Sequence, residues 1–337
     1  MSLEKKILVT GGAGFIGSNF ILYFIKAYPT YHIINLDKLT YAGDTSNLDE
    51  IKSNDRYTFV LGDICDEVLV NDIFKQHNIF SVIHFAAESH VDNSIKSPNN
   101  FIKTNIEGTM VLLEAARKHW LTNNDSAFIN RFHHISTDEV YGSLGPEGFF
   151  TEESPYAPNS PYSASKASAD FLVRSYHHTY GLNTVISHCS NNYGAKQHNE
   201  KLIPTIIRKA LAEEAIPIYG DGENVRDWLY VADHCRAIDL VFHNGNSGES
   251  YVIGGKNEHT NLYIAEKVCE LLDHMHPKET GSYKDQIKFV KDRLGHDYRY
   301  AIDASKIKNN LGWQPEEKFN SGMSKTVEWY LEKYLNA

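Results

Sequence analysis

Three glycines near the start of the chain limit the folds open to it. Gly11, Gly14 and Gly17 lie in TGGAGFIG, between the apolar run KKILVT and the helical pattern FIGSNFILYFIKAY. Glycines at a strand-to-helix turn let the backbone approach a pyrophosphate, which the first N–H groups of the helix can bind. The alternative is that these glycines serve only to pack the helix on the strand, in which case they indicate no ligand.

An acidic residue in the right place supports the nucleotide interpretation. Asp37 closes the next apolar run, twenty residues beyond Gly17. A carboxylate there accepts hydrogen bonds from an adenosine ribose and disfavours a 2′-phosphate, which selects NAD over NADP. Asp63, at the end of the third run, fits the adenine side. The sequence therefore predicts a Rossmann-type site for NAD.

Short apolar runs alternate with helical patterns through the first half of the chain. The expected strands are KKILVTG, YHIINLD, YTFVLGD, FSVIHFAA, FHHIST and NTVISHC, with helices at 15–28, 66–77 and 103–120. This alternation is typical of a parallel sheet covered on both faces, so we expect a doubly wound α/β fold. Residues 1–195 are expected to form an NAD-binding Rossmann domain. Residues 196–337 are expected to form mainly a smaller, mixed α/β substrate lobe, with some crossing of the chain between lobes.

Composition narrows the class of protein. A net charge of −10 argues against a nucleic-acid binder, which usually carries a basic face. No apolar run approaches the roughly 20 residues that span a bilayer, and the N-terminus does not resemble a secretory signal. Four scattered cysteines without C-x-x-C spacing predict free thiols and no metal site. We expect a cytoplasmic protein.

Two residue pairs suggest chemistry. Tyr162 and Lys166 are four apart, so they share one face of a helix. A lysine ammonium and a cationic nicotinamide ring would favour the tyrosine phenolate, making Tyr162 a base at neutral pH. Asp138 and Glu139 follow Thr137 at the end of the run FHHIST. They are either a solvated turn or an acid and a base at one reaction centre.

Several blocks together carry a family resemblance. TGGAGFIG, HFAAESHVDNSI, STDEVYG, PYSASKA, SNNYG and RDWLYVADHCRAI resemble the extended short-chain dehydrogenase/reductase superfamily, from about residue 5 to 313. The Thr-Asp-Glu triplet resembles in particular the members that dehydrate nucleotide-linked glucose. Other dehydratases, epimerases and decarboxylases of nucleotide sugars remain alternatives. A non-catalytic NAD-sensing regulator would need neither Tyr162 nor Lys166.

The resemblance implies a hydro-lyase acting on dTDP-glucose, as a step toward dTDP-rhamnose or another deoxysugar. Tyr162 would take the proton of the C4 hydroxyl while Thr137 hydrogen-bonds the same oxygen. Glu139 would remove the C5 proton and Asp138 would protonate the departing C6 hydroxyl. A homodimer joined by a four-helix bundle, from the helices at 100–119 and around Tyr162, is also implied.

The resemblance also implies contact residues. For the cofactor they are Gly11, Gly14, Phe15, Ile16, Gly17, Asp37, Lys38, Thr40, Asp63, Ile64, Ala86, Ala87, Ser89, Thr104, Tyr162, Lys166 and Asn192. For the substrate they are Ser89, Thr137, Asp138, Glu139, Asn191, Lys201, Leu202, Pro217, Ile218, Tyr219, Arg226, Asn261, Arg293 and His296. The chain departs from the family pattern at Leu294, where proline is usual, and in the loop AKQHNEKLIP.

Overall fold

A seven-stranded parallel sheet forms the centre of the molecule. The computed structural model describes residues 5–122 and 130–336. The strand order is β10-β6-β5-β4-β1-β2-β3, with every neighbouring pair parallel. The strands are β1 (Lys5–Thr10), β2 (Tyr31–Asp37), β3 (Tyr57–Leu61), β4 (Ser81–His84), β5 (Phe132–Thr137), β6 (Thr184–Cys189) and β10 (Ser250–Ile253). The predicted doubly wound α/β fold is confirmed, and β1 to β6 are the six strands expected from the sequence.

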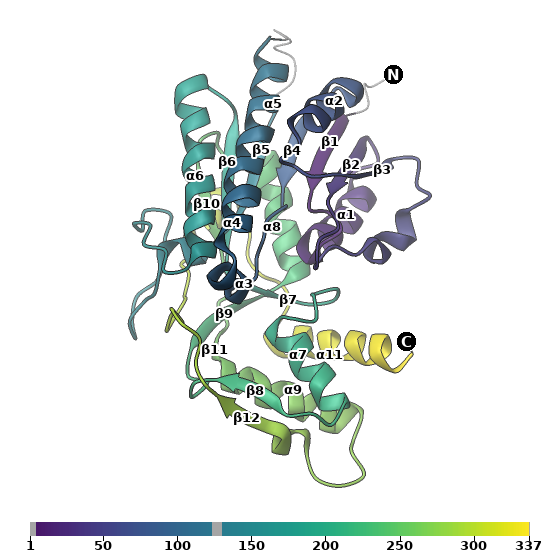
Figure 1. Ribbon diagram of the computed structural model, residues 1–337, viewed down its shortest axis with the longest axis vertical. Coiled ribbons are helices and arrows are strands. Elements are labelled where there is room, and N and C mark those ends of the chain that lie inside the picture. The colour runs from purple at the N-terminus through teal and green to yellow at the C-terminus, as the bar shows by residue number, and fades with distance from the viewer. Residues whose placement is uncertain (1–4, 123–129, 337) are drawn as a thin grey trace.

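Helices cover both faces of this sheet (Figure 1). One layer holds α1 (Phe15–Ala27) and α8 (Val231–Asn244), and the other holds α2 (Glu67–His77), α5 (Gly108–Thr122) and α6 (Pro161–Tyr180). Alternate residues of a strand point to opposite faces. In β1, Ile7 and Val9 therefore pack in the α1–α8 layer, while Leu8 packs in the other.

Five shorter helices lie among the described residues between β2 and α6. They are η1 (Thr45–Ile51), α3 (Val91–Lys96), α4 (Pro98–Phe101), the π-helical η2 (Ile102–Glu107) and the 3-10 helix η3 (Asp138–Tyr141). The helix expected at 103–120 therefore begins with a wider turn and continues as α5.

The second half of the chain builds most of a smaller lobe, drawn below the large sheet in Figure 1. It holds the sheet β11-β9-β7 and the pair β12-β8. Their strands are β7 (Asn191–Tyr193), β8 (Ile216–Tyr219), β9 (Val225–Tyr230), β11 (Glu258–Thr260) and β12 (Ile287–Val290). The helices are α7 (Leu202–Leu211), α9 (Asn261–Met275), η4 (Tyr283–Gln286) and α11 (Phe319–Leu335), while α10 (Ser305–Leu311) packs against β10. A separate hydrophobic core, including Ile207, Val268 and Val327, fills this lobe.

Local sequence explains where α6 begins and ends. The side chain of Ser160 accepts a hydrogen bond from the Ser163 backbone N–H, and the Ser163 side chain accepts one from the Ser160 backbone in return. Pro161 occupies the first turn, where its missing N–H costs nothing. Gly181, at φ 70°, ends the helix. This well-defined start holds Tyr162 and Lys166 in the first turns.

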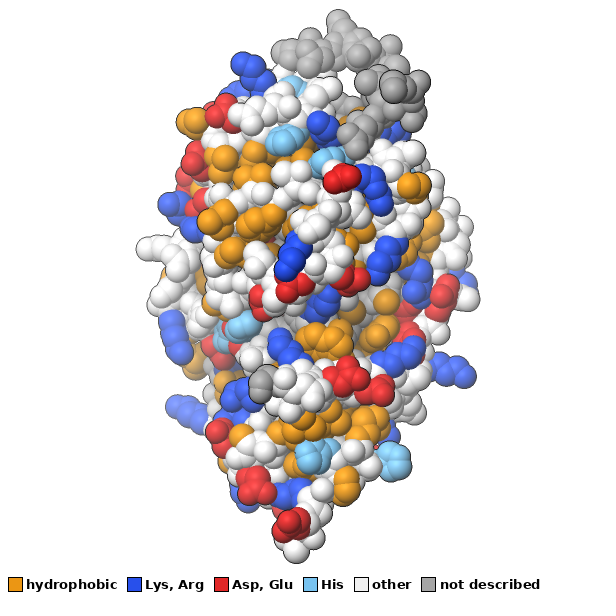
Figure 2. Space-filling model, turned by 90° about the vertical axis from the view of Figure 1, so that its right-hand side faces the viewer, with side chains coloured by type: hydrophobic (Ala, Val, Ile, Leu, Met, Phe, Trp, Pro, Cys, Tyr) orange, Lys and Arg blue, Asp and Glu red, His pale blue; other side chains and the backbone are white. Residues whose placement is uncertain are grey.

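The charged surface, the helices and the cysteines of the described residues bear on the class of protein. On the face drawn in Figure 2, Lys and Arg are interspersed with Asp and Glu and do not gather by sign. Within residues 5–122 and 130–336, no helix has the length and apolar character needed to cross a bilayer. All four cysteines are free.

Candidate active site

One pocket lies at the carboxyl ends of the large sheet's strands, beside the segment that follows β6. All seventeen residues predicted to contact the cofactor line it, from Gly11 in the first turn to Asn192 in β7. Thr137, Asp138 and Glu139 line the same pocket, as do Ser89, Asn191 and Lys201. Ligands of doubly wound folds bind at this edge of the sheet. The structure therefore brings the predicted nucleotide and chemical residues into one space.

The glycine turn fits a pyrophosphate. A Cβ on Gly11 would lie 2.6 Å from the Ala86 nitrogen, and one on Gly17 would lie 2.4 Å from the Gly11 oxygen. Larger residues at these positions would force the turn open. Gly14 is the N-cap of α1, and no side chain caps this helix end. Its first backbone N–H groups and the helix dipole are thus available to an anion in the pocket.

The far end of the pocket carries two carboxylates. Asp37 accepts hydrogen bonds from the Ala13 N–H at 2.9 Å and the Leu39 N–H at 2.8 Å, one on each oxygen. Each oxygen keeps a lone pair for a ribose hydroxyl. Lys38 Nζ donates to Asp63 Oδ2 at 2.6 Å. These bonds orient the two acids that the sequence singled out.

Burial and neighbouring charge separate the acids of the triplet. Thr137 caps η3, since its side chain accepts a hydrogen bond from the Glu139 N–H at 3.3 Å. Burial raises the pKa of Asp138 well above its usual range, and Glu139 adds to the rise. Burial also raises the pKa of Glu139, but Arg293, Arg226 and Lys201 oppose it. Asp138 Oδ2 has no hydrogen-bond partner among the described residues. Asp138 is thus suited to carry a proton and Glu139 to accept one, so the alternative of a solvated turn is wrong.

Burial acts on the charges of both members of the Tyr162–Lys166 pair. Both side chains are buried in the pocket. Burial raises the pKa of Tyr162 well above its usual value, with Glu139 adding to the rise and the hydrogen bond with Thr137 opposing it. Burial also lowers the pKa of Lys166 to about 8. The protein alone therefore does not favour the phenolate, so the prediction that Tyr162 acts as a base depends on the cationic nicotinamide ring.

The other predicted substrate residues do not line this pocket. They are Leu202, Pro217, Ile218, Tyr219, Arg226, Asn261, Arg293 and His296. Arg293 and Arg226 lie near enough to act on the charge of Glu139, and the Arg293 Nε has no hydrogen-bond partner among the described residues. Ile218, by contrast, is 1% exposed within the small lobe's core. Its predicted contact can involve only the backbone.

Several pocket residues were not predicted. They include Glu88, Ser136, Cys189, Ser190, Gln197, His198 and Glu200. Glu88 and Glu200 lie beside predicted residues in AAESHVD and EKLIP, so their position next to Ser89 and Lys201 was the available signal. Lys201 Nζ donates a hydrogen bond to the backbone carbonyl oxygen of Ser89 at 3.0 Å. This bond joins two distant parts of the pocket wall.

The fold and these residues define a class of protein. A glycine-rich strand-to-helix turn, an acid after the second strand and a buried Tyr/Lys pair together define an extended short-chain dehydrogenase/reductase. The family model described as GDP-mannose 4,6 dehydratase matches residues 8–326.

Known proteins identify the family more closely. The dTDP-glucose 4,6-dehydratase of Escherichia coli is 55% identical over 336 residues, covering 97% of this chain and 92% of that protein. A crystal structure of the Bacillus anthracis enzyme, in complex with NAD, has a TM-score of 0.86 at 47% identity and covers 98% of each chain. The Streptomyces venezuelae enzyme, with NAD and TYD bound, has a TM-score of 0.89 at 45% identity and covers 97% of each chain. The chain belongs to the dTDP-glucose 4,6-dehydratase family.

Proposed function

We propose that this protein converts dTDP-glucose to dTDP-4-keto-6-deoxy-glucose and water, with NAD as a cofactor that is regenerated in each cycle. The observation that carries the proposal is the pair of a buried acid, Asp138, and a partly buried base, Glu139, beside Tyr162 in a dinucleotide pocket. An epimerase needs only the Tyr, Lys and Thr part of this set. Full-length similarity to dTDP-glucose 4,6-dehydratases supports the same conclusion.

The first task of the chain's residues is to remove a proton from the C4 hydroxyl. Tyr162 is the base, and Thr137 hydrogen-bonds the same oxygen. Bound NAD accepts a hydride from C4, returns it to C6, and contributes a positive ring that favours the Tyr162 phenolate. The glycine turn with Phe15 and Ile16 holds the pyrophosphate, and Asp37 binds the adenosine ribose.

The second task is elimination of water across C5 and C6. A ketone at C4 acidifies the C5 proton, which Glu139 removes. Asp138 donates a proton to the C6 hydroxyl, which departs as water. Its raised pKa keeps that proton available at neutral pH. Glu139 then returns a proton to C5.

The nucleotide portion lies toward the smaller lobe in this proposal. Lys201, Asn191, Arg226 and Arg293 supply donors and positive charge for the diphosphate, and the planar fork of an arginine matches phosphate oxygens. Ser89, Leu202, Asn261, His296 and the 217–219 strand complete the enclosure. Leu294, in the loop of Arg293 and His296 after β12, is 74% exposed, so its side chain is free to contact a ligand.

A direct incubation tests the proposal. Purified protein is mixed separately with dTDP-glucose, UDP-glucose and GDP-mannose, and the products are weighed by mass spectrometry. We expect loss of one water from dTDP-glucose. Loss of water from none of the three would refute dehydratase activity, and loss from another sugar alone would reassign the substrate.

We infer further that the protein is a cytoplasmic homodimer serving deoxysugar synthesis. Apolar side chains exposed on and just before the α5–α6 pair support the dimer: Ile102, Met110 and Phe171 are 51%, 42% and 53% exposed. A four-helix bundle formed with a second copy would cover them. We also propose that the boundary between the two lobes lies near residue 195. The chain crosses this boundary again, since α8 and β10 lie beyond residue 195 and pack on or pair with the large sheet.

A further inference from the structure

A buried carboxylate outside the proposed mechanism lies behind the catalytic lysine. Asp170 is one turn beyond Lys166 on α6, and the two residues are 1% and 3% exposed. Burying an ionised carboxylate is costly unless hydrogen bonds and an opposite charge compensate. A group placed there at such cost calls for a reason beyond packing.

The hydrogen bonds to the Asp170 carboxylate gather on one oxygen, Oδ2, while Oδ1 has no hydrogen-bond partner among the described residues. Its Oδ2 accepts hydrogen bonds from Ser136 Oγ at 2.9 Å and from the Tyr156 hydroxyl at 3.2 Å, and lies 3.0 Å from His188 Nε2. Its Oδ1 lies 3.3 Å from His134 Nε2. Although burial alone would raise it, His188 and His134 hold the pKa of Asp170 well below its usual range. Asp170 is therefore a permanent negative charge.

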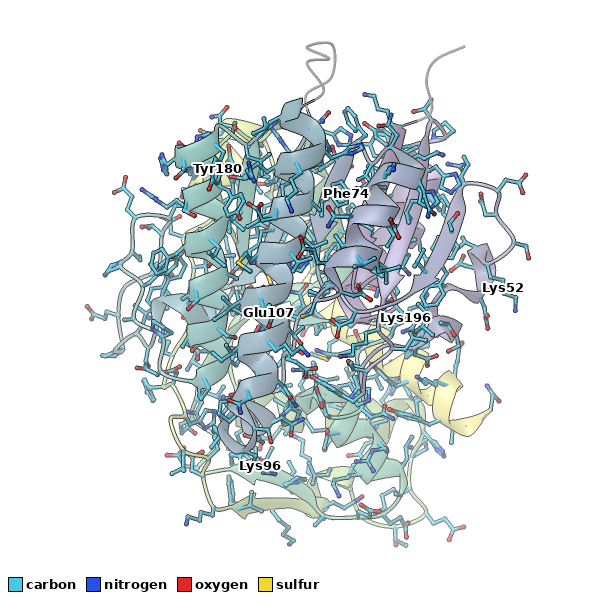
Figure 3. All side chains as sticks on the ribbon, turned by 45° about the horizontal axis from the view of Figure 1, so that its top comes forward. Lys52, Phe74, Lys96, Glu107, Tyr180 and Lys196 are labelled. Atoms are coloured by element: carbon cyan, nitrogen blue, oxygen red, sulfur yellow. The ribbon has the colours of Figure 1, made fainter. Side chains whose placement is uncertain are left out.

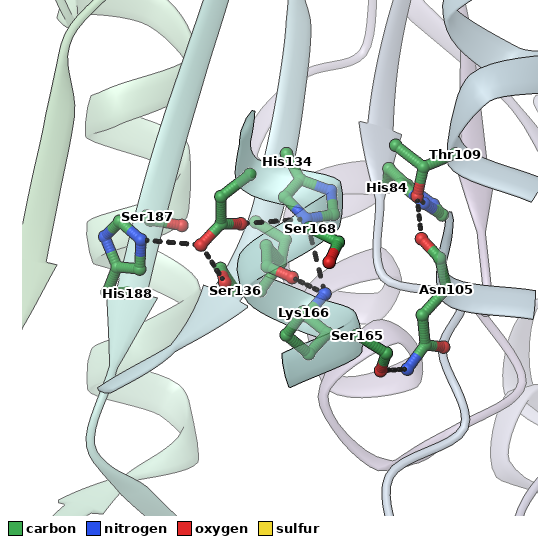
Figure 4. A network of polar contacts seen from close by, with 12 residues as sticks. His84, Asn105, Thr109, His134, Ser136, Ser165, Lys166, Ser168, Ser187 and His188 are labelled. Atoms are coloured by element: carbon green, nitrogen blue, oxygen red, sulfur yellow. Dashed lines mark hydrogen bonds and ion pairs between the residues drawn. The ribbon is translucent and has the colours of Figure 1, made fainter. Parts of the chain in front are cut away.

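His134 connects this charge to the lysine. Its Nε2 lies 3.4 Å from Lys166 Nζ and 3.3 Å from Asp170 Oδ1, so one ring nitrogen lies between the two charged groups (Figure 4). Lys166 Nζ also donates to the Ile135 oxygen at 2.8 Å. Burial lowers the pKa of His134 to about 4, so the ring is neutral at neutral pH.

Asp170 is the main negative charge acting on Lys166. Burial favours the neutral amine of Lys166, and Asp170 is the foremost group opposing that effect. Burial also favours the protonated form of the nearby acid Asp138, and the charge of Glu139 is balanced by Arg293, Arg226 and Lys201. The titratable groups around the lysine on the packed elements are His84, His134, Asp138, Glu139, Tyr162, Asp170, His188 and Cys189.

We propose that Asp170 is a positioning residue for the oxidation step: its negative charge keeps the buried Lys166 an ammonium and so keeps Tyr162 usable as a base. The identity of that step rests on the function proposed above. A merely structural carboxylate would hold α6 against β5 and β6 without affecting the protonation of the lysine.

The pH dependence of the first half-reaction separates these roles. In Asp170→Asn the lysine loses its counter-charge, so it should lose its proton at lower pH. We expect the alkaline limb of single-turnover NADH formation with dTDP-glucose to move down by about one to two pH units. A structural role would lower the rate at every pH and leave the limb in place, which would overturn the proposal.

Asp239 provides a matched control. It is a buried carboxylate of α8 that accepts hydrogen bonds from the Tyr23 and Tyr28 hydroxyls at 2.7 and 2.9 Å and pairs with His243. Asp239→Asn removes a similar tyrosine–histidine–carboxylate cluster far from the pocket. It should reduce stability and leave the alkaline limb unmoved.

A second pair of variants covers the case in which Asp170→Asn does not fold. Asp170→Glu and Asp170→Gln carry the same extra methylene, so they share any packing penalty and differ only in charge. The alkaline limb of the Glu variant should stay at the wild-type pH, and that of the Gln variant should move to lower pH. Equal limbs in these two variants would refute the role of the charge.

A measurement without substrate keeps this test apart from that of the overall function. The phenolate absorbance of Tyr162 is titrated in NAD-loaded protein, with Tyr162→Phe subtracted to remove the other tyrosines. In Asp170→Asn the phenolate should form at higher pH, because a neutral amine no longer favours it. If the phenolate titration shifts but dTDP-glucose loses no water, the role of Asp170 is supported and the proposed function is refuted. If dTDP-glucose loses water but neither the alkaline limb nor the phenolate titration shifts, the function is supported and the role of Asp170 is refuted.

Discussion

Asp138 and Glu139 are neighbours in the chain but face different surroundings. Asp138 is 1% exposed, with Glu139 and Asp227 as the nearby charges that raise its pKa. Glu139 faces Arg293, Arg226 and Lys201, which lower its pKa against the effect of burial. Two carboxyl groups whose environments push their pKa values apart are suited to act as an acid and a base. Their assignment can be tested one residue at a time.

Replacing the proposed base should separate the oxidation from the elimination. Glu139→Gln keeps the size of the side chain and removes its basicity. Bound NAD should still be reduced on addition of dTDP-glucose, while C5 proton exchange and water loss fall by about 10²- to 10⁴-fold. Absorbance of NADH, deuterium incorporation and mass spectrometry measure the three events.

Tyr162→Phe is the control for this variant. It should already stop NADH formation, because the phenyl ring cannot take the C4 hydroxyl proton. Normal product formation by Glu139→Gln would show that another group is the base.

Replacing the proposed acid should cost activity and increase stability. The folded pKa of Asp138 is raised, so the folded state holds a proton that the unfolded state releases above its usual value near 3.8. The free energy of unfolding therefore falls as pH rises from that value through the folded pKa. Asp138→Asn removes this dependence, and we expect its free energy of unfolding at pH 7 to exceed that of the wild type by roughly 1 kcal/mol or more.

Urea denaturation at pH 4 and pH 7 measures the effect. The gain should shrink at pH 4, where the unfolded carboxyl is partly protonated as well. An equal gain at both values would mean that Asp138 is not held protonated in the folded protein.

At the scale of elements, the turn between β1 and α1 depends on contacts that only glycine permits. A Cβ at position 17 would lie 2.4 Å from the Gly11 oxygen and 2.8 Å from the Gly12 Cα, both backbone atoms. Gly17→Ala should therefore displace α1, cost about 1–3 kcal/mol of stability and weaken NAD binding. Calorimetric titration with NAD and thermal denaturation check both effects.

Gly145→Ala is the matched control, because a Cβ there would meet nothing within 4 Å. It should change neither property. Unchanged NAD affinity in Gly17→Ala would show that the turn can reshape without losing the cofactor.

Sequence patterns predict some elements better than others for a physical reason. The strands β1 to β6 and the start of α6 follow from local signals: apolar runs, and the Ser160, Pro161 and Ser163 cap. The loop after β7 has no such signal. Lys196 adopts φ 72°, which favours glycine, and its Nζ donates to the Asn47 oxygen at 2.6 Å. Figure 3 shows Lys196 between the large sheet and α11.

Distant parts of the chain hold this loop in place. Asn19 donates to the Ala195 oxygen at 3.1 Å, and the Tyr330 hydroxyl of α11 donates to the Gln197 oxygen at 2.5 Å. These partners come from α1 and α11, which are more than 100 residues away in sequence. The shape of the loop depends on these tertiary contacts, which a local pattern cannot reveal.

At the scale of the whole molecule, the site is assembled from both halves of the chain. Among the predicted cofactor residues, the sequence pattern located Gly11, Gly14, Gly17, Asp37 and Asp63, because they lie at or just after the ends of strands of one parallel sheet, whose carboxyl ends meet at one edge. The other cofactor contacts come from the resemblance. The predicted substrate residues beyond 200 lie at the start of α7, on β8, β9 and α9, and in the loop after β12, which belong to different small sheets and helices. No single pattern relates these elements, so their positions come from resemblance rather than periodicity.

The largest arrangement that can be tested is the dimer. Phe171 is 53% exposed on α6 and Met110 is 42% exposed on α5, and these two helices pack against each other. Large exposed apolar side chains on adjacent helices are typical of a surface that a partner covers. If a second copy forms the four-helix bundle, Phe171→Asp places a charge in its apolar centre and should shift the protein from dimer to monomer. Analytical ultracentrifugation of the wild type and the variant measures the change.

A charge placed on another exposed apolar side chain controls for solubility. Phe289 on β12 is 58% exposed but lies in the smaller lobe, away from α5 and α6. Phe289→Asp should stay dimeric. Because Tyr162 and Lys166 lie on the same helix as Phe171, the monomer should also lose part of its activity as α6 loses support. A monomeric wild type, or a Phe171→Asp variant that remains a dimer, would place the interface elsewhere.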